Sequence, residues 1–223
     1  MKKQENDRKA ELVFILDRSG SMSGFENDTV GGYNAMMEKQ REAGMDATVT
    51  TVLFDDRYEL LHDRVKLDEL KPMTNEEYYV RGSTALIDAI GKTINKIEKA
   101  QAHIADGHKA DKVIFVITTD GLENASCKFS AEDVKRMVER KREANGWEFI
   151  FMGANIDAVE TAAHYGFQRS RAVKFYNDSD GIKLNNKVIG ETLCAMACAE
   201  ASFSDDEMAD HLAPIAEYRK IKE

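Results

Sequence analysis

Three short polar segments adjoin the apolar stretches of this sequence. Asp17, Ser19 and Ser21 come directly after one apolar run, and Asp120 comes directly after another. Thr84 lies in a Gly-Ser-Thr segment that leads into a long amphipathic stretch. Together the segments supply two carboxylates and several hydroxyls, with neither histidine nor cysteine among them. Oxygen ligands of this kind suit a small hard cation, so they predict a Mg²⁺ or Mn²⁺ site.

The spacing of these residues indicates how a cation could be held. In Asp17-x-Ser19-x-Ser21, alternate side chains lie on one side of an extended turn, so three oxygens converge. A site built mostly from neutral hydroxyls leaves a dication undercompensated, and it would attract an outside carboxylate, such as an Asp or Glu of a partner protein. Each residue also has a purely structural interpretation: the serines and Asp120 could belong to turns, and Thr84 could cap a helix. The combination of all three segments favours the metal site.

Short apolar runs alternate with amphipathic stretches along the chain. We expect strands at 12–17, 47–54, 58–62, 112–119, 148–153 and 172–176. We expect helices at 29–43, 84–104, 130–143, 157–165, 182–201 and 204–220, the last interrupted at Pro214. Such alternation predicts an α/β fold with a mostly parallel six-stranded sheet, its third strand antiparallel, flanked by helices. Ligands bind beyond the carboxyl ends of the strands in such sheets, where the polar segments lie.

Length and composition indicate one globular domain. A chain of 223 residues with 43% hydrophobic and 32% charged residues can bury a core. We expect a flexible lead-in at 1–10, one domain at 11–200 and a C-terminal helical extension at 201–223. The formal charge of −9 argues against binding to a nucleic-acid backbone.

We expect a cytoplasmic protein that does not enter a membrane. The first apolar run is shorter than the ~7–15 residues of a signal peptide, and no run reaches the ~20 residues of a membrane span. The 3 cysteines are an odd number without a CxxC pair, which fits a reducing compartment.

The polar segments resemble those of a von Willebrand factor type A (vWA) domain. That family carries a metal-ion-dependent adhesion site (MIDAS) with the pattern DxSxS, then T, then D, which is matched here by Asp17-Arg-Ser19-Gly-Ser21, Thr84 and Asp120. Neighbouring segments also resemble stand-alone bacterial members: DRSGSM, GSTALIDAI, TTDGLEN and GANIDA. The resemblance covers about residues 11–176.

The resemblance implies a Rossmann-like, doubly wound sheet with strand order 3-2-1-4-5-6. It implies that Ser19 and Ser21 bind Mg²⁺ directly, and that Thr84 does so directly or through water. Asp17 and Asp120 would act mostly through water, and an Asp or Glu of a protein partner would complete the coordination. Members of the family commonly mediate contacts between proteins and often work within larger assemblies.

Three further residues could border the site and contact a partner. Asn155 lies just past a predicted strand end, and Glu123 and Asn124 follow Asp120 closely. The alternative for Asn155 is that it only caps the next helix. Asp88, one turn into the long helix, is expected to face solvent or to complement the positive end of the helix dipole.

These residues leave three functions open. The favoured one is a metal-dependent protein-binding module without catalysis of its own. The first alternative is a Mg²⁺-dependent phosphohydrolase with Asp17 as nucleophile, although enzymes of the haloacid-dehalogenase type usually have DxD where this chain has Ser19. The second is a scaffold with a vestigial metal site that acts through its helical C-terminus.

Overall fold

The apolar runs of the sequence form the strands of one sheet. The computed structural model describes residues 8–105, 107–154 and 156–222. Within them the sheet has six strands in the order β3-β2-β1-β4-β5-β6. All neighbours are parallel except β2 and β3, which confirms the predicted fold class. The strands are β1 (Lys9–Asp17), β2 (Asp46–Phe54), β3 (Tyr58–Lys66), β4 (Lys112–Thr119), β5 (Glu148–Gly153) and β6 (Ala172–Lys174).

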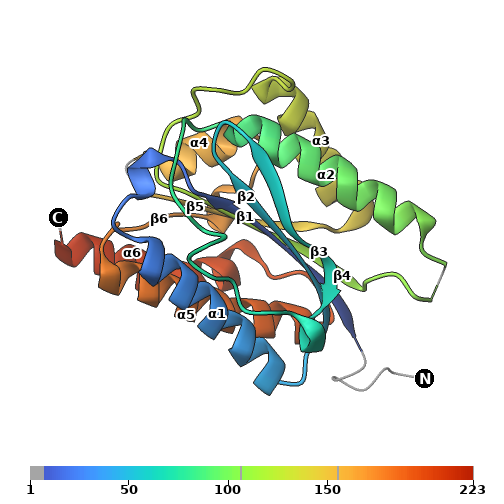
Figure 1. Ribbon diagram of the computed structural model, residues 1–223. Helices are drawn as coiled ribbons and strands as arrows, with labels where there is room; N and C mark the ends of the chain where they lie inside the picture. Colours follow the sequence, from blue (N-terminus) through green and yellow to red (C-terminus); the bar gives the residue numbers. More distant parts are fainter. Residues whose placement is uncertain (1–7, 106, 155, 223) are drawn as a thin grey trace.

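Helices cover both faces of the sheet. Helices α1, α5 and α6 lie on one face, and α2, α3 and α4 lie on the other (Figure 1). The helices are α1 (Glu26–Glu42), α2 (Leu86–His103), α3 (Ala131–Asn145), α4 (Ala158–His164), α5 (Ser179–Cys198) and α6 (Asp205–Lys222). Short 3₁₀ turns follow β1 (Gly20–Met22, η1), follow β3 (Leu67–Glu69, η2) and precede β6 (Arg169–Arg171, η3). None of the helices in the described ranges has both the length and the apolar character needed to cross a membrane.

The burial of β1 explains why its sequence is apolar without alternation. Leu12 and Phe14 pack into the cluster under α1, α5 and α6, whereas Val13 and Ile15 pack into the cluster under α2, α3 and α4. Because successive strand residues point to opposite faces, a strand covered on both sides needs apolar residues at every position.

Several boundaries differ from the sequence-based expectation. Strand β1 begins at Lys9, so Lys9 and Ala10 belong to the sheet and not to the expected lead-in; residues 1–7 lie outside the described residues. Strand β3 continues past the predicted end at His62 to Lys66. The prediction ended too early because β3 is an edge strand, and the charged residues of such strands interrupt the apolar pattern. Helix α3 begins as expected, with a capping box between Ser130 and Asp133.

Helix α6 runs without a break through Pro214, so the expected interruption there is wrong. A proline inside a helix leaves the carbonyl of the residue four positions earlier without its partner. That residue is Asp210, and both Asp210 and Pro214 are exposed, so water can solvate the carbonyl. The opposite side of α6 packs on α5, and its Met208 and Leu212 are buried in the same cluster as the core of the sheet.

Candidate metal centre

The predicted metal ligands gather where the first and fourth strands end. Strands β1 and β4 are parallel neighbours, so their carboxyl ends lie at the same edge of the sheet. From here the chain crosses to β2 through α1 on one face and to β5 through α3 on the other. Crossovers that diverge in this way open a crevice at the sheet edge. Asp17 is the last residue of β1, and Asp120 directly follows β4.

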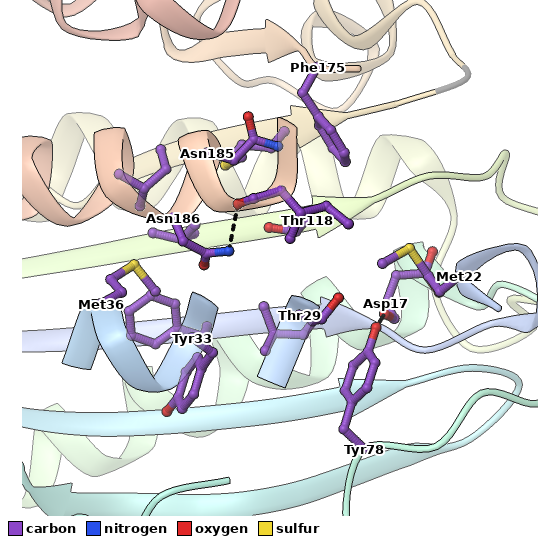
Figure 2. Close-up of a pocket in the computed structure, with 16 residues that line it drawn as sticks. Asp17, Met22, Thr29, Tyr33, Met36, Tyr78, Thr118, Phe175, Asn185 and Asn186 are labelled. Carbon is purple, nitrogen blue, oxygen red and sulfur yellow. Dashed lines mark hydrogen bonds between the residues drawn. The ribbon is translucent and has the colours of Figure 1, made fainter. Parts of the chain in front are cut away.

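Asp17 is buried and held by the protein at both carboxylate oxygens. The backbone N–H of Ser19 donates to Oδ1 over 2.7 Å, and the Thr119 hydroxyl donates to Oδ2 over 2.6 Å. Its backbone carbonyl accepts a hydrogen bond of 2.5 Å from the hydroxyl of Tyr78, whose ring points toward it (Figure 2). These contacts fix the carboxylate, which fits a residue that orients a metal's water shell.

The serine hydroxyls connect the first polar segment to Asp120. The Oγ atoms of Ser19 and Ser21 lie 3.1 Å apart, and Ser21 Oγ donates to Asp120 Oδ1 over 2.5 Å. Ser19 has extended backbone angles, but a 3₁₀ turn begins at Gly20, so the segment is more tightly folded than the extended turn expected from the sequence. The oxygens still converge.

Thr84 reaches the same place from the other side. A Cβ atom added at Gly121 would lie 3.4 Å from Thr84 Oγ1 and 3.5 Å from Ser21 Oγ, so both hydroxyls border the space beside this glycine. Thr84 does not cap α2 with its side chain, since the N-cap position belongs to Ala85 and no side-chain cap bond forms there. All five predicted metal residues are therefore brought together.

The electrostatics of these residues fit a dication. Burial raises the pKa of Asp17; hydrogen bonds from Thr119 and Ser19 oppose the rise, and the neighbouring Asp120 carboxylate adds to it. Burial also raises the pKa of Asp120. In the described parts of the chain, no lysine or arginine forms an ion pair with either carboxylate. Two buried like charges without a cation are costly, and a bound divalent cation relieves that cost.

The donor set limits the kind of metal that these residues could hold. Across the described residues, no group of three or more His, Cys, Asp or Glu side chains is arranged to hold a metal. A metal site in this part of the chain must therefore draw on other oxygens, as the serine and threonine hydroxyls provide. Hard cations such as Mg²⁺ accept such ligands, with water in the remaining positions.

Two of the expected rim residues are engaged inside the protein. Asn124 Oδ1 accepts a hydrogen bond of 2.9 Å from the backbone N–H of Thr84, which fixes that metal residue. Glu123 accepts one of 2.8 Å from the N–H of Ile87 at the start of α2 and others from the N–H groups of Ala125 and Ser126. These contacts make them positioning residues of the metal loops. Asn155 lies outside the described residues, and its rim role stays a prediction.

Asn177 is a neighbour of the site that sequence reasoning missed. It follows β6, and its Nδ2 donates to Asp120 Oδ2 over 3.2 Å. Its Oδ1 is buried and has no hydrogen-bond partner among the described residues. A buried amide oxygen normally has a donor, so a water or a metal-bound water fits beside it. The predicted strand at 172–176 ends directly before Asn177, so its position past a strand end was the signal that could have found it.

A buried ion network holds the loops around the site. The Arg18 side chain is fully buried, with ion pairs of 3.0 Å to Asp55 and 2.6 Å to Glu59. Arg81 forms a second ion pair of 2.6 Å with Asp55. Burial acts to raise the pKa of Asp55, but hydrogen bonds from Arg81, Arg57 and Arg18 outweigh it and hold this pKa below its usual value. The network joins the loops after β1 and β2 to the loop before α2.

Large apolar side chains are exposed beside the site. Leu122, two residues after Asp120, is 66% exposed, and Tyr79, next to Tyr78, is 42% exposed. The ring of Tyr79 lies under the guanidinium groups of Arg18 and Arg81, at 4.9 and 5.2 Å from its centroid. Ile221 is the other large hydrophobic residue exposed in the described ranges. Leu122 and Tyr79 thus lie on loops that adjoin the predicted metal residues along the chain.

The cavity next to Asp17 is small. It has a volume of about 40 Å³ and lies between the sheet and helices α1 and α5, with Met22, Thr29 and Asn185 in its wall (Figure 2). This volume suits an ordered water and not an organic substrate.

Comparisons with known proteins yield similar folds. No family model matches the chain, and no curated protein matches it. A structure of proximal thread matrix protein 1 (PTMP1) from the mussel byssus is 16% identical, with 86% of this chain and 47% of that chain covered and a TM-score of 0.56. A structure of the same mussel protein with a zinc occupied MIDAS motif is 16% identical, with 84% and 46% covered and a TM-score of 0.54.

A bacterial domain is similar over nearly its whole length. The vWF domain of the type V pili tip protein Mfa5 from Porphyromonas gingivalis is 9% identical, with 89% of this chain and 99% of that chain covered and a TM-score of 0.61. The chain spans about half of the mussel protein, at 47%. At sequence identities this low, these similarities establish the fold alone. The chain has the fold of a von Willebrand factor type A domain.

Proposed function

We propose that this chain is a metal-dependent protein-binding module. Asp17, Ser19, Ser21, Thr84 and Asp120 would hold Mg²⁺ or Mn²⁺, and the cation would bind an Asp or Glu of a protein partner. The observation that carries the proposal is the convergence of three hydroxyls on two buried carboxylates that lack a cationic partner in the described residues. The zinc occupied MIDAS motif of the mussel protein, which has a similar fold, supports a divalent metal.

The buried and the exposed residues of the site would have different roles. Asp17 has both oxygens engaged by Ser19 and Thr119, so it would orient the site and not bind a partner. Ser21 is exposed and would lie on the side where a partner arrives. When bound, the cation supplies positive charge that neutral hydroxyls do not cancel, and a carboxylate is the natural ligand for it.

Leu122 and Tyr79 would contribute the rest of the partner surface. Both are exposed on loops that adjoin the metal residues. A partner carboxylate that reaches the cation would bring its neighbouring side chains onto these two residues. We therefore propose a partner segment that combines an Asp or Glu with an apolar residue.

The phosphohydrolase alternative has less support. A nucleophilic Asp17 would need access to substrate, yet the residue is 2% exposed and both carboxylate oxygens accept hydrogen bonds. The adjacent cavity has room for a water and not for a phosphoester. We propose that the protein is not an enzyme. A vestigial site is also less well supported, because all five side chains are present and adjacent.

Calorimetry with Mg²⁺ and Mn²⁺ tests the metal site. We expect binding by the wild type and a loss of about tenfold or more in affinity for Asp120→Ala and Ser19→Ala, because each removes an oxygen from the site or its shell. Asp210→Ala, an exposed aspartate on α6, is the matched control and should bind as the wild type does. A wild type that binds neither metal would refute the proposal.

Affinity capture from a cell extract then tests the partner role. We expect the same proteins to be lost with a chelator and with Asp120→Ala. Retention of every captured protein under both conditions would argue against a metal-bridged contact. The cytoplasmic location stays a prediction.

A further inference from the structure

A wide groove runs along α2 on the side where the sheet ends. It has a volume of about 1020 Å³. Its wall includes Tyr58 and Leu60 of β3 and four basic or titratable residues of α2: Lys92, Lys96, Lys99 and His103. We propose that this α2–β3 groove is a second binding surface, and that it takes a short acidic segment of a polypeptide.

The groove exists because β3 is the edge strand. Helix α2 packs against β1 and β2, which leaves part of the β3 face uncovered. Tyr58 and Leu60 are consequently only half-buried. Two polar contacts link α2 to β3 here: a hydrogen bond of 3.3 Å from Thr93 to the Tyr58 hydroxyl, and the pairing of Lys96 with Asp63. The floor of the groove is therefore apolar and accessible.

Three lysines and a histidine of α2 form one row along this floor. Positions 92, 96, 99 and 103 are spaced by four, three and four residues, which places them on one side of a helix. Lys96 is paired with Asp63 over 2.8 Å. Lys92 lies over the ring of Tyr58, 3.8 Å from its centroid. Lys92 and Lys99 are exposed and form no ion pair with any described residue.

A second hollow, with Asp133 as well as basic residues in its wall, adjoins the end of the groove. Phe129 borders both the groove and this hollow, whose basic residues are Lys128, Arg136 and Arg140. Arg136 and Arg140 are paired with acidic neighbours, whereas Lys92 and Lys99 are not. In a protein with a formal charge of −9, uncompensated lysines gathered over apolar side chains form a surface complementary to an acidic partner.

The shape and charge favour a short peptide over a nucleic acid. The row from position 92 to position 103 is ~16 Å long at ~1.5 Å per residue, which matches about five residues of extended chain. An alternating segment could direct its carboxylates to the lysines and its apolar side chains to Tyr58 and Leu60. A nucleic acid would bring many more negative charges toward a protein of charge −9.

The groove is independent of the metal centre. None of the five predicted metal residues lines it. Binding there should therefore persist in a chelator, whereas binding at the metal centre should not. This difference separates the present inference from the proposed function.

Selection from a displayed library of random peptides, about ten residues long, tests the inference. The full chain is used in EDTA, as wild type and as the double variant Lys92→Glu/Lys99→Glu. The matched control is Lys71→Glu/Lys220→Glu, which reverses two exposed lysines elsewhere. We expect wild type and control to enrich peptides that combine acidic and apolar residues. A labelled copy of the enriched peptide should bind the groove variant about tenfold or more weakly by fluorescence polarisation.

Three results would overturn the inference. The first is no enrichment of acidic peptides by the wild type in EDTA. The second is equal peptide affinity in the wild type and the groove variant. The third is failure of the peptides together with lysine-dependent binding of a labelled oligothymidine, which would assign the groove to single-stranded nucleic acid.

Discussion

In the absence of metal, the charge of Asp120 has two opposing effects on stability. It accepts hydrogen bonds from Ser21 and Asn177, yet it is buried beside a second carboxylate. Removing the Asp120 charge should therefore raise the stability of the metal-free protein and reduce the stabilisation that a bound metal provides. The conflict is typical of functional sites, where local stability is lower than the fold would allow.

We expect Asp120→Asn to unfold at a higher temperature than wild type in EDTA, because a buried like charge is removed. At a Mg²⁺ concentration near 100 times the wild-type Kd, the unfolding free energy of the wild type should rise by about 2.7 kcal/mol, and that of the variant should rise much less. Thermal unfolding with and without Mg²⁺ measures both effects. Equal Mg²⁺-dependent stabilisation of the two proteins would contradict the assignment of Asp120.

Asn177 should act on the metal through Asp120. We expect Asn177→Ala to weaken Mg²⁺ binding by about tenfold, because it removes the donor that orients Asp120 Oδ2. Asn75→Ala, an exposed residue away from the metal residues, serves as the control and should leave the Kd unchanged. Calorimetry gives the affinities. An unchanged Kd in Asn177→Ala would exclude a positioning role.

Sequence reasoning found the residues that lie within a recognisable segment or directly beside a predicted element. Asp17, Ser19 and Ser21 belong to one segment, and Thr84 and Asp120 each adjoin an element that the apolar pattern revealed. Thr119 and Asn177 were missed. Their contributions depend on contacts with Asp17 and Asp120, and no local pattern records such distances.

At the scale of elements, the start of α2 depends on a loop far along the chain. Asp88 was expected to face solvent or to complement the helix dipole, and it lies in the first turn of α2. Its carboxylate also accepts hydrogen bonds from the backbone N–H groups of Cys127, Lys128 and Phe129. It thereby holds the segment after β4, which carries the metal loop, against α2. The sequence could not reveal this, because the partners are backbone groups that any residue type provides.

The pKa of Asp88 makes this contact sensitive to pH. Burial acts to raise the pKa, but the three backbone hydrogen bonds outweigh it and hold the pKa below its usual value. A lowered folded-state pKa contributes stability above the unfolded value of about 3.9 and loses it as pH falls through the folded value.

We expect Asp88→Ala to cost about 0.5–1.5 kcal/mol of unfolding free energy at pH 7, because three backbone N–H groups lose their acceptor and water can partly replace it at these mostly exposed positions. The difference from wild type should shrink as the pH falls from about 5 toward the folded-state pKa. Urea unfolding across this range measures it. Asp68→Ala, at an exposed position on η2, is the control. A difference that stays constant with pH would show that the Asp88 charge contributes nothing.

At the scale of the whole molecule, the apolar pattern was sufficient for the sheet. Runs that are apolar at every position predicted strands covered on both faces, and the alternation with helices predicted their parallel arrangement. The length of the edge strand β3 was underestimated, because its exposed side carries charged residues. The relation of α6 to the domain was also beyond the sequence. Met208, Leu212 and Ile215 recur at helical spacing, but that spacing does not say which surface they pack against.

The buried residues of α6 predict that it unfolds together with the sheet. Leu212 is 3% exposed within the core cluster under α1 and α5. We expect Leu212→Ala to cost about 2–5 kcal/mol and to shift a single unfolding transition. Ala213→Gly, on the less buried side of the same helix, should cost about 1 kcal/mol. A main transition that is unchanged in Leu212→Ala would mean that α6 is a separate extension.

The burial of Arg18 has a thermodynamic consequence for association. Its ion pair with Asp55, together with the Arg81–Asp55 pair, orders three loops when the chain folds, before any metal or partner arrives. The entropy of ordering these loops is therefore lost during folding and not during binding. Partner association should consequently resemble the docking of a rigid body. Its heat-capacity change should reflect the apolar area of the interface alone, without the larger negative value that accompanies folding on binding.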